Sequence, residues 1–248
     1  MEVSVRRKLS ENLKRIRERI AAACERRGRR PEEVRLIAVT KTVEVDVVRS
    51  AVEAGLLDFG ESRVQELIRR AGMIREHLGR RRVIDHDHVP ANPRWHMIGH
   101  LQRNKVRGLL PWVDVVHSLD SLRLAEEISA EAAKAHRTIP VLMEVNVSGE
   151  RSKLGMAVGA VSHLAENIRS LPGIQVVGLM TMAPLVEPAD TRQYFARLRE
   201  VLEDMRTERV VGPEFRELSM GMSNDFEIAI EEGATMVRIG TALFEGAQ

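Results

Sequence analysis

The stretch "RLIAVTKTVEVD", from Arg35 to Asp46, starts like a buried strand and then reaches a lysine. Its first residues are mostly apolar or small, which is typical of a strand covered on both faces. Lys41 follows between two threonines. A lysine at this position is either a solvated strand end or a reactive amine. The rest of the sequence has to distinguish these two readings.

Seven more apolar runs follow, separated by charged stretches with helical spacing. Together the runs predict strands at Val34–Thr40, Leu56–Ser62, Arg94–His100, Val113–Ser118, Ile139–Val147, Ile174–Met182, Phe215–Gly221 and Met236–Phe244. Strands that alternate with helices form parallel βαβ units, and eight such units predict a (β/α)8 TIM barrel. The competing fold is a doubly wound open sheet. That fold would usually carry a glycine-rich turn after its first strand, where this chain has Thr-Lys-Thr.

The segment before the first strand predicts an extra N-terminal helix. Its apolar residues recur every three or four positions, at Leu9, Leu13, Ile16, Ile20 and Ala23. Gly28 is the expected stop. We therefore expect one domain over residues 1–248, with a helix within residues 1–30 packed on the barrel. The polar, proline-containing stretch Gly79–Arg94 is expected to be an exposed loop.

Composition excludes several classes of protein. Net charge is only +2 and aromatics are 3% of the 248 residues, which argues against nucleic acid as a partner. The single Cys24 excludes an intrachain disulfide and a cysteine metal cluster. No apolar run is long enough for a membrane helix, and no signal-peptide core precedes the first helix. We expect a cytoplasmic protein without a membrane partner. No interface pattern stands out, so a monomer is expected.

The ends of the last two predicted strands carry residues suited to a phosphate. Barrel active sites lie at the carboxyl ends of the strands, and the loops after strands seven and eight often bind phosphate. These loops read "SMGMS" and "RIGT" and offer Ser219, Gly221, Ser223, Gly240 and Thr241. Glycine lets the backbone approach a ligand, and Ser223 is also a predicted N-cap of a helix through Glu232. The alternative is that these are ordinary turn glycines and a cap.

A phosphate site at this mouth changes the interpretation of Lys41. A lysine there is expected to lose contact with water, and a neutral amine forms Schiff bases with carbonyls. An aldehyde and a phosphate on one small ligand suggest pyridoxal 5'-phosphate (PLP). Arg238 is then expected to point inward and face the pyridine nitrogen, which it would keep unprotonated. The alternative for Arg238 is a structural ion pair with Glu217 or Glu245.

These residues belong to motifs that resemble a known family. The matching stretches include "AVTKT", "FGESRVQEL", "WHMIGHLQRNKV", "VNVSGERSKLG", "GLMTMAP" and "LSMGMSNDFEIAIEEGATMVRIGTALF". They resemble the pyridoxal phosphate homeostasis protein family, whose fold is similar to the N-terminal barrel of alanine racemase. The resemblance implies that Lys41 is the Schiff-base lysine. It implies that Arg238 faces the pyridine nitrogen, and that Ser219, Gly221, Ser223, Gly240 and Thr241 belong to phosphate-binding motifs. Ser62 departs from the asparagine common in the family.

The resemblance implies PLP carriage or buffering rather than catalysis, with apo PLP-dependent enzymes as possible recipients. The alternative is a PLP-dependent enzyme such as a weak amino-acid racemase. Alanine racemase uses a tyrosine from a second domain, whereas Tyr194, the chain's one tyrosine, falls on a predicted outer helix. No catalytic residue is therefore assigned.

Four other features remain open. The stretch Asp85–His88 ("DHDH") has ligand types for a metal, but we expect a flexible loop and no metal site. His96 and His100 are either groups near the ligand or packing histidines. Lys153 is either a solvated loop lysine, which we favour, or a second amine for PLP. Glu144 and Asn146 are two apart and are expected on one face of a strand.

Overall fold

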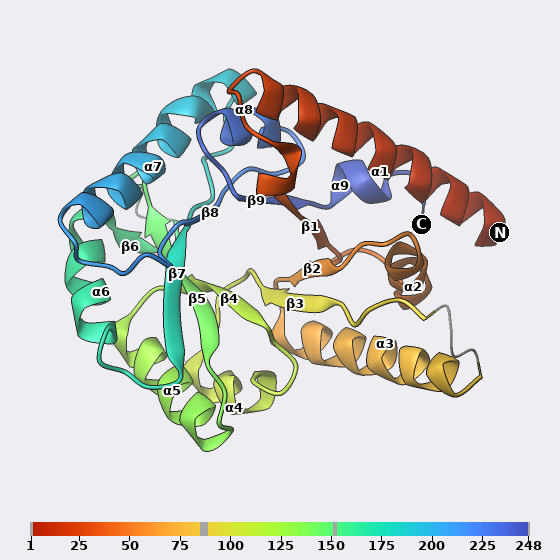
Figure 1. The fold of residues 1–248 in the computed structure, drawn as a ribbon, viewed down its shortest axis with the longest axis horizontal. Helices are drawn as coiled ribbons and strands as arrows, with labels where there is room; N and C mark the ends of the chain where they lie inside the picture. Colours follow the sequence, from red (N-terminus) through yellow and green to blue (C-terminus); the bar gives the residue numbers. More distant parts are fainter. Residues whose placement is uncertain (1, 85–88, 151–152, 248) are drawn as a thin grey trace.

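The computed structural model describes residues 2–84, 89–150 and 153–247, except the side chains of residues 2 and 3. Within them, eight parallel strands form a closed barrel surrounded by helices (Figure 1). The strands are β1 Arg35–Val39, β2 Asp58–Glu61, β3 Arg94–Met97, β4 Val115–Leu119, β5 Ile139–Asn146, β6 Met156–Ala157, β7 Ile174–Met180, β8 Glu217–Ser219 and β9 Met236–Ile239. The eight predicted strands are confirmed, and the two-residue β6 is an addition that pairs only with the end of β5.

The barrel closes because its first strand pairs on both sides. β1 lies between β2 and β9, with Ala38 opposite Phe59 and Arg35 opposite Met236. β4 pairs with β5, which completes the ring on the other side. All these pairs are parallel, so the carboxyl ends of the strands meet at one mouth. The expected (β/α)8 barrel is therefore confirmed.

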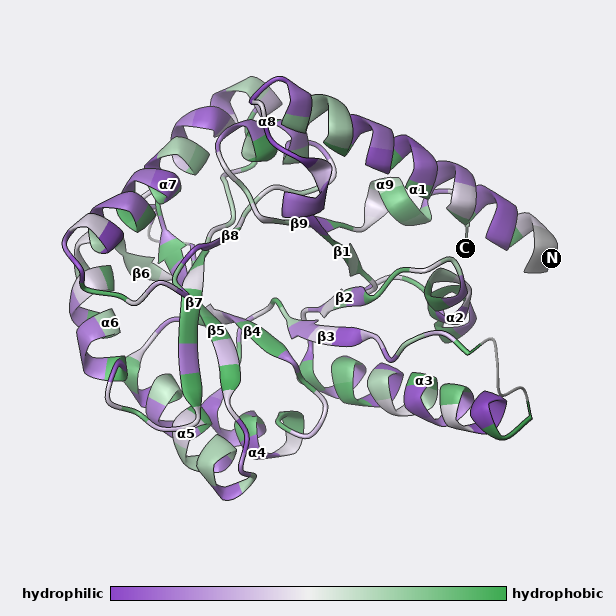
Figure 2. Ribbon diagram, in the orientation of Figure 1, coloured by the Kyte–Doolittle hydropathy of each residue, from purple (hydrophilic) through white to green (hydrophobic). Residues whose placement is uncertain are grey.

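Alternation along each strand divides the apolar residues into two groups. Outward residues pack under the helices in one large core cluster, which includes Phe59, Trp95 and Val237. A small separate cluster of Val115, Leu142 and Met180 fills part of the barrel interior. Polar side chains such as His96, His117 and Arg238 occupy other interior positions. Figure 2 shows β3 in the hydrophilic colour because it carries an arginine and a histidine.

The helices are α1 Glu2–Glu25, α2 Val45–Glu53, α3 Val64–Ile84, α4 Val106–Leu109, α5 Leu122–Lys134, α6 Val161–Ile168, α7 Arg192–Thr207, α8 Phe226–Glu231 and α9 Thr241–Phe244. The predicted apolar face of α1 is buried and packs against α2, α8 and α9. Burying each large aliphatic side chain of that face contributes about 1.5–3 kcal/mol. Gly28 follows the helix with a positive φ of 62°, which agrees with the expected stop. None of the described helices is long and apolar enough to cross a membrane.

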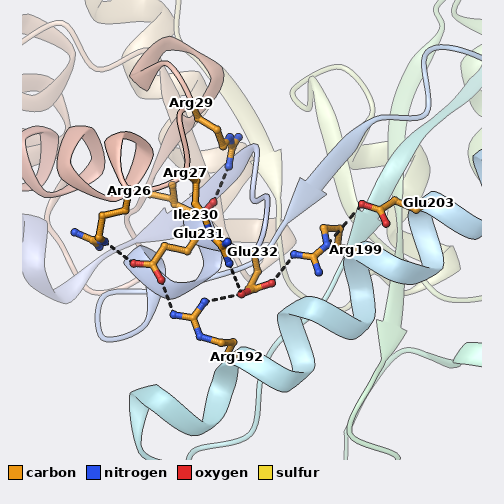
Figure 3. A network of polar contacts seen from close by, with 9 residues as sticks. All are labelled: Arg26, Arg27, Arg29, Arg192, Arg199, Glu203, Ile230, Glu231 and Glu232. Atoms are coloured by element: carbon orange, nitrogen blue, oxygen red, sulfur yellow. Dashed lines mark hydrogen bonds and ion pairs between the residues drawn. The ribbon is translucent and has the colours of Figure 1, made fainter.

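Two glutamates at the end of α8 hold three helical segments together (Figure 3). Glu231 and Glu232 are only 15% and 5% exposed in their side chains. Their partners are Arg26 and Arg27, directly after α1, and Arg192 and Arg199 on α7. This arginine–glutamate network fixes the end of α1 against the barrel. It also places most of the positive charge of this region in ion pairs rather than in an anion site.

The prediction of a loop over Gly79–Arg94 is wrong at its start, whereas the strand predicted to begin at Arg94 does so. Helix α3 continues to Ile84, and β3 begins at Arg94. The helix extends because arginines favour helix and a single glycine is tolerated there. Arg81 also anchors the last turn by pairing with Glu53 at 3.2 Å. Residues 85–88, which include the "DHDH" motif, lie outside the described residues.

Two predicted boundaries near the mouth are also wrong. The last strand ends at Ile239, because Gly240 opens the short helix α9 where strand had been expected to continue. Ser223 does not cap α8, which begins at Phe226 with Asp225 as the capping residue. Both errors have the same cause. When a glycine-rich turn follows a short barrel strand, the sequence does not indicate at which residue the strand ends.

Candidate functional site

Lys41 lies on a turn whose two ends are held by buried groups. The Thr40 hydroxyl donates a hydrogen bond to Glu61 Oε1 at 2.5 Å, and the Val43 carbonyl accepts one from Arg70. Arg70 and Glu61 form an ion pair at 3.0 Å. The Lys41 side chain is exposed and has no hydrogen bond or ion pair to any described residue, so the expected loss of contact with water is not found. The backbone is fixed while the amine is available.

Glycines occupy both loops that follow the last two barrel strands, and Gly240 lies close to this turn. Gly221 has φ of 90°, and a Cβ added there would lie 2.5 Å from the Ala229 Cβ. A Cβ added at Gly240 would lie 3.2 Å from the carbonyl oxygen of Val39, two residues before Lys41. Gly221 does not accept a side chain, because its positive φ is strained for other residues and a Cβ there would clash. Gly240 therefore packs on the strand that leads to Lys41, whereas Gly221 is buried against α8.

Hydroxyl groups tie these two loops together. The Ser223 Oγ accepts a hydrogen bond from the backbone N–H of Ala242 at 3.3 Å, and Thr241 beside it is exposed. Asp225 accepts a hydrogen bond from the Met222 N–H at 2.6 Å, and burial raises the pKa of its carboxyl. The Asp225 carboxylate oxygen therefore has its hydrogen-bond partner within its own loop. This places Ser223 and Thr241 beside the glycines and leaves them partly or fully accessible.

Arg238 and Ser219 lie deeper, in the barrel interior. Arg238 is 4% exposed and donates to Ser219 Oγ at 2.7 Å and to the Thr181 carbonyl at 2.9 Å. The inward orientation expected for Arg238 is therefore observed, and the alternative ion pairs with Glu217 or Glu245 are absent from the described contacts. Ser219 is fully buried. Its hydroxyl contacts Arg238 below the two glycine loops.

Ser219 continues into a row of polar side chains across the barrel. Its Oγ is 2.9 Å from His117 Nδ1, and His117 Nε2 is 2.9 Å from His96 Nδ1. His96 Nε2 is 2.9 Å from Asp58 Oδ1. Both histidines are fully buried, and burial lowers the pKa of each imidazole. Of the two histidines considered from sequence, His96 is thus inside the barrel and indirectly connected to Arg238.

Glu144 is a buried carboxyl in the same mouth. It shares its strand face with Leu142 of the interior cluster and is 2% exposed. It makes no hydrogen bond to a described residue. Burial, together with nearby Asp120, raises the pKa of Glu144 to about 7 against the opposing charge of Arg238. Asn146 on the same face instead holds the following loop through Ser148 Oγ at 3.1 Å.

The remaining candidates make no hydrogen bond or ion pair to Lys41, Arg238 or Glu144 within the described residues. His100 is half-exposed and 3.4 Å from Asp120, and Lys153 Nζ is 3.5 Å from the Ala183 carbonyl. Ser62 contributes backbone that packs against Gly99, where an added Cβ would be 2.3 Å from its oxygen. Within residues 2–84, 89–150 and 153–247, no group of three metal-ligating side chains gathers.

The sequence placed His117 at the mouth end of its strand without naming a role or a partner for it, and Asp58 was not recognised as part of the interior. Both sit on apolar strands whose neighbours are buried, Asp58 before Phe59 and His117 after Val116. A polar residue at an inward position of a buried strand requires a buried partner, and that signal was present. The partner could not be named, because the contact from His117 to Ser219 spans 102 residues.

Comparison with known proteins agrees with the geometry. The family model described as alanine racemase, N-terminal domain, matches residues 9–248. A pyridoxal phosphate homeostasis protein of Aquifex aeolicus is 43% identical, with 94% of this chain and 96% of that protein covered. The chain belongs to this family. The expected resemblance is confirmed.

Two solved structures of other proteins are similar to this chain, and one of them contains PLP. PipY of Synechococcus elongatus, solved with PLP bound, is 33% identical with a TM-score of 0.76, covering 92% of this chain and 99% of that one. Alanine racemase of Clostridium difficile has a TM-score of 0.68 at 15% identity, covering 95% of this chain and 56% of that one. The second likeness shows the barrel fold alone.

Proposed function

We propose that this protein binds PLP reversibly through a Schiff base to Lys41 and carries or buffers it in the cell. The observation that supports this most is that the free Lys41 amine and the glycine loops share one mouth. Gly240 packs on Val39, two residues before the lysine. The same mouth holds Arg238, whose guanidinium uses only two hydrogen bonds to described residues.

The residues fit PLP in type and in position. The loops that contain Gly221 and Gly240 would supply backbone N–H groups for the phosphate, and Ser223 and Thr241 would supply hydroxyls. Arg238 would face the pyridine nitrogen and, as a permanent donor, would leave that nitrogen unprotonated. When bound, PLP supplies the aldehyde that reacts with the amine. Ser219, first assigned to the phosphate, is better suited to holding Arg238, since its hydroxyl already contacts it at 2.7 Å.

The position of Tyr194 favours carriage over turnover. Tyr194 lies on α7, outside the strands of the barrel. The curated relatives are named homeostasis proteins, which supports the same reading. We further propose that the protein acts as a cytoplasmic monomer and that apo PLP-dependent enzymes receive the ligand. A weak racemase remains the second candidate, and buried Glu144 is the observation that favours it.

The binding proposal is tested by reduction and mapping. Purified protein incubated with PLP should develop a visible absorption band, and borohydride should then fix the label on the peptide that contains Lys41. Lys41→Ala should lose the band, while Lys153→Ala should keep it. No band in the wild-type protein, or a label that stays in Lys41→Ala, would overturn the proposal.

A second experiment separates carriage from catalysis. The loaded protein is incubated with L-alanine and with D-alanine in deuterated water. A carrier leaves the Cα hydrogen unexchanged over the time in which PLP passes to an added apo-enzyme. Exchange that continues through many turnovers and disappears in Glu144→Gln would instead establish the racemase.

A further inference from the structure

A single row of hydrogen bonds runs through the barrel from the ligand mouth toward the opposite end. It joins Arg238, Ser219, His117, His96 and Asp58, with donor–acceptor distances of 2.7, 2.9, 2.9 and 2.9 Å. The side chains come from five different strands, and the step from His117 on β4 to Ser219 on β8 crosses the interior. Asp58 is the first residue of its strand, so the row ends far from the mouth.

The hydrogen bonds in this row all run in one direction when both imidazoles are neutral. Arg238 can only donate, so Ser219 Oγ accepts from it, and a neutral His117 that donates from Nε2 accepts the Ser219 proton at Nδ1. An ionised Asp58 can only accept, so His96 Nε2 carries a proton. Between them, His117 Nε2–H donates to His96 Nδ1. Each imidazole therefore has one tautomer, protonated on Nε2.

The electrostatics of the groups around the row agree with this assignment. Burial would raise the pKa of Asp58, but hydrogen bonds from His96 and Arg94 outweigh it and lower the pKa. Arg35, at 4.0 Å, adds a further positive charge beside the same carboxylate. Burial lowers the pKa of both histidines, and for His117 the charge of Arg238 acts in the same direction. Two neutral imidazoles thus lie between a cation and an anion.

The carboxylates that act most on the charge of Arg238 are other than Asp58. Glu144 and Asp225 influence Arg238 through space, but neither is hydrogen-bonded to it. Burial lowers the pKa of Arg238 to about 10, which still leaves it charged at neutral pH. A fully buried guanidinium needs aligned acceptors. The described structure provides them through Ser219 and the Thr181 carbonyl.

We propose that His96 and His117 are positioning residues that orient Ser219 and Arg238 toward the ligand by linking them to Asp58. Because Ser219 gives its proton to His117, its oxygen accepts from Arg238 and fixes one end of the guanidinium, as the Thr181 carbonyl fixes the other. The effect on the ligand rests on the proposed PLP binding. The tautomers and the direction of the row do not rest on it.

The first test needs no ligand. ¹⁵N NMR of histidine-labelled protein, assigned with His96→Gln and His117→Gln, should show both imidazoles neutral and protonated on Nε2 at neutral pH. Asp58→Asn should leave the hydrogen-bonded row in place. It should weaken the deshielding of the His96 Nε2–H proton. A doubly protonated His117, or an Nδ1–H tautomer in either ring, would overturn the direction assigned to the row.

The second test measures PLP affinity with matched variants. His117→Leu should weaken PLP binding about tenfold, the loss expected when one hydrogen-bonded support is removed. His117→Gln, which offers both an acceptor and a donor, should recover most of that loss. Ser129→Ala removes a buried hydroxyl bonded to the Pro172 carbonyl on the outer wall and serves as the control for general destabilisation.

The two tests distinguish a failure of the positioning role from a failure of the proposed PLP binding. Equal PLP affinities for His117→Leu and Ser129→Ala would overturn the positioning role while leaving PLP binding in place. A wild-type protein that does not bind PLP would overturn the proposed function, and the NMR result on the unliganded protein would still decide the row.

Discussion

Arg70 and Glu61 form a buried ion pair at 3.0 Å, with side chains only 5% and 1% exposed, and together they hold both ends of the Lys41 turn. Glu61 accepts from Thr40 on one side, and Arg70 donates to the Val43 carbonyl on the other. The pair lies outside the barrel wall, under α3. It therefore acts on the position of the amine without contacting it.

Removing one partner of this ion pair should lower the free energy of unfolding. Arg70→Met leaves Glu61 buried without its cation and frees the Val43 carbonyl, so we expect a loss of about 3–5 kcal/mol in the free energy of unfolding. Arg69→Met, one position earlier on the same helix, breaks only an exposed pair with Glu66 and should cost at most about 1 kcal/mol. Urea unfolding of both variants measures the difference.

The double variant gives the sharper result. Arg70→Met combined with Glu61→Gln removes both charges, so part of the loss seen in Arg70→Met should be recovered. Burial already raises the pKa of Glu61 in the wild type. The loss in Arg70→Met should therefore shrink as the pH falls and Glu61 takes up a proton. A loss independent of pH would show that the Val43 contact, rather than the charge, dominates.

Glu144 should make the protein less stable as the pH rises through neutrality. Burial raises its pKa from 4.5 to about 7, so the folded state binds a proton that the unfolded state has already released. The resulting stability is fully present below pH 4.5 and is lost as the pH rises through 7. Glu144→Gln should therefore be more stable than wild type at about pH 8, by up to about 3 kcal/mol, and similar at about pH 4. Thermal unfolding across this range tests the sign.

The barrel architecture could be predicted from the sequence, because strands and helices are indicated by patterns among residues close together in the chain. Eight apolar runs and their amphipathic connections follow from alternation and helical spacing, and the buried face of α1 follows from residues such as Leu9 and Ile16. Strand ends were less accurate. β8 and β9 stop where Gly221 and Gly240 turn the chain, and a backbone turn of this kind depends on neighbouring strands.

The interior contacts could not be predicted in the same way. Lys41, Gly221 and Arg238 could be placed at one mouth from strand counting, but the support behind them depends on pairs far apart in sequence. The contact of Arg238 with the Thr181 carbonyl spans 57 residues, and Arg70 reaches Val43 across 27. Such contacts depend on barrel register, which hydrophobic alternation does not specify.

Gly221 should not tolerate a side chain. Its φ of 90° and the added Cβ at 2.5 Å from Ala229 combine backbone strain with a steric clash. We expect Gly221→Ala to cost several kcal/mol, about 1–3 from each of the two effects, and to weaken PLP binding. Gly28→Ala is the matched control, because Gly28 also has a positive φ of 62° but open space around its Cβ position. Similar losses in the two variants would show that strain alone matters.

The network around Glu232 should determine how firmly α1 is attached. Hydrogen bonds from Arg192 and Arg199 lower the pKa of Glu232 in spite of its burial, so its contribution is present above pH 4.5 and is lost as the pH falls below it. Glu232→Gln should cost about 1–3 kcal/mol at neutral pH and increase hydrogen exchange in α1. Glu203→Gln removes a 60% exposed partner of Arg199 and should have little effect on either measurement. If α1 exchanges equally in both variants, its attachment rests on the apolar face of the helix and not on the arginine–glutamate network.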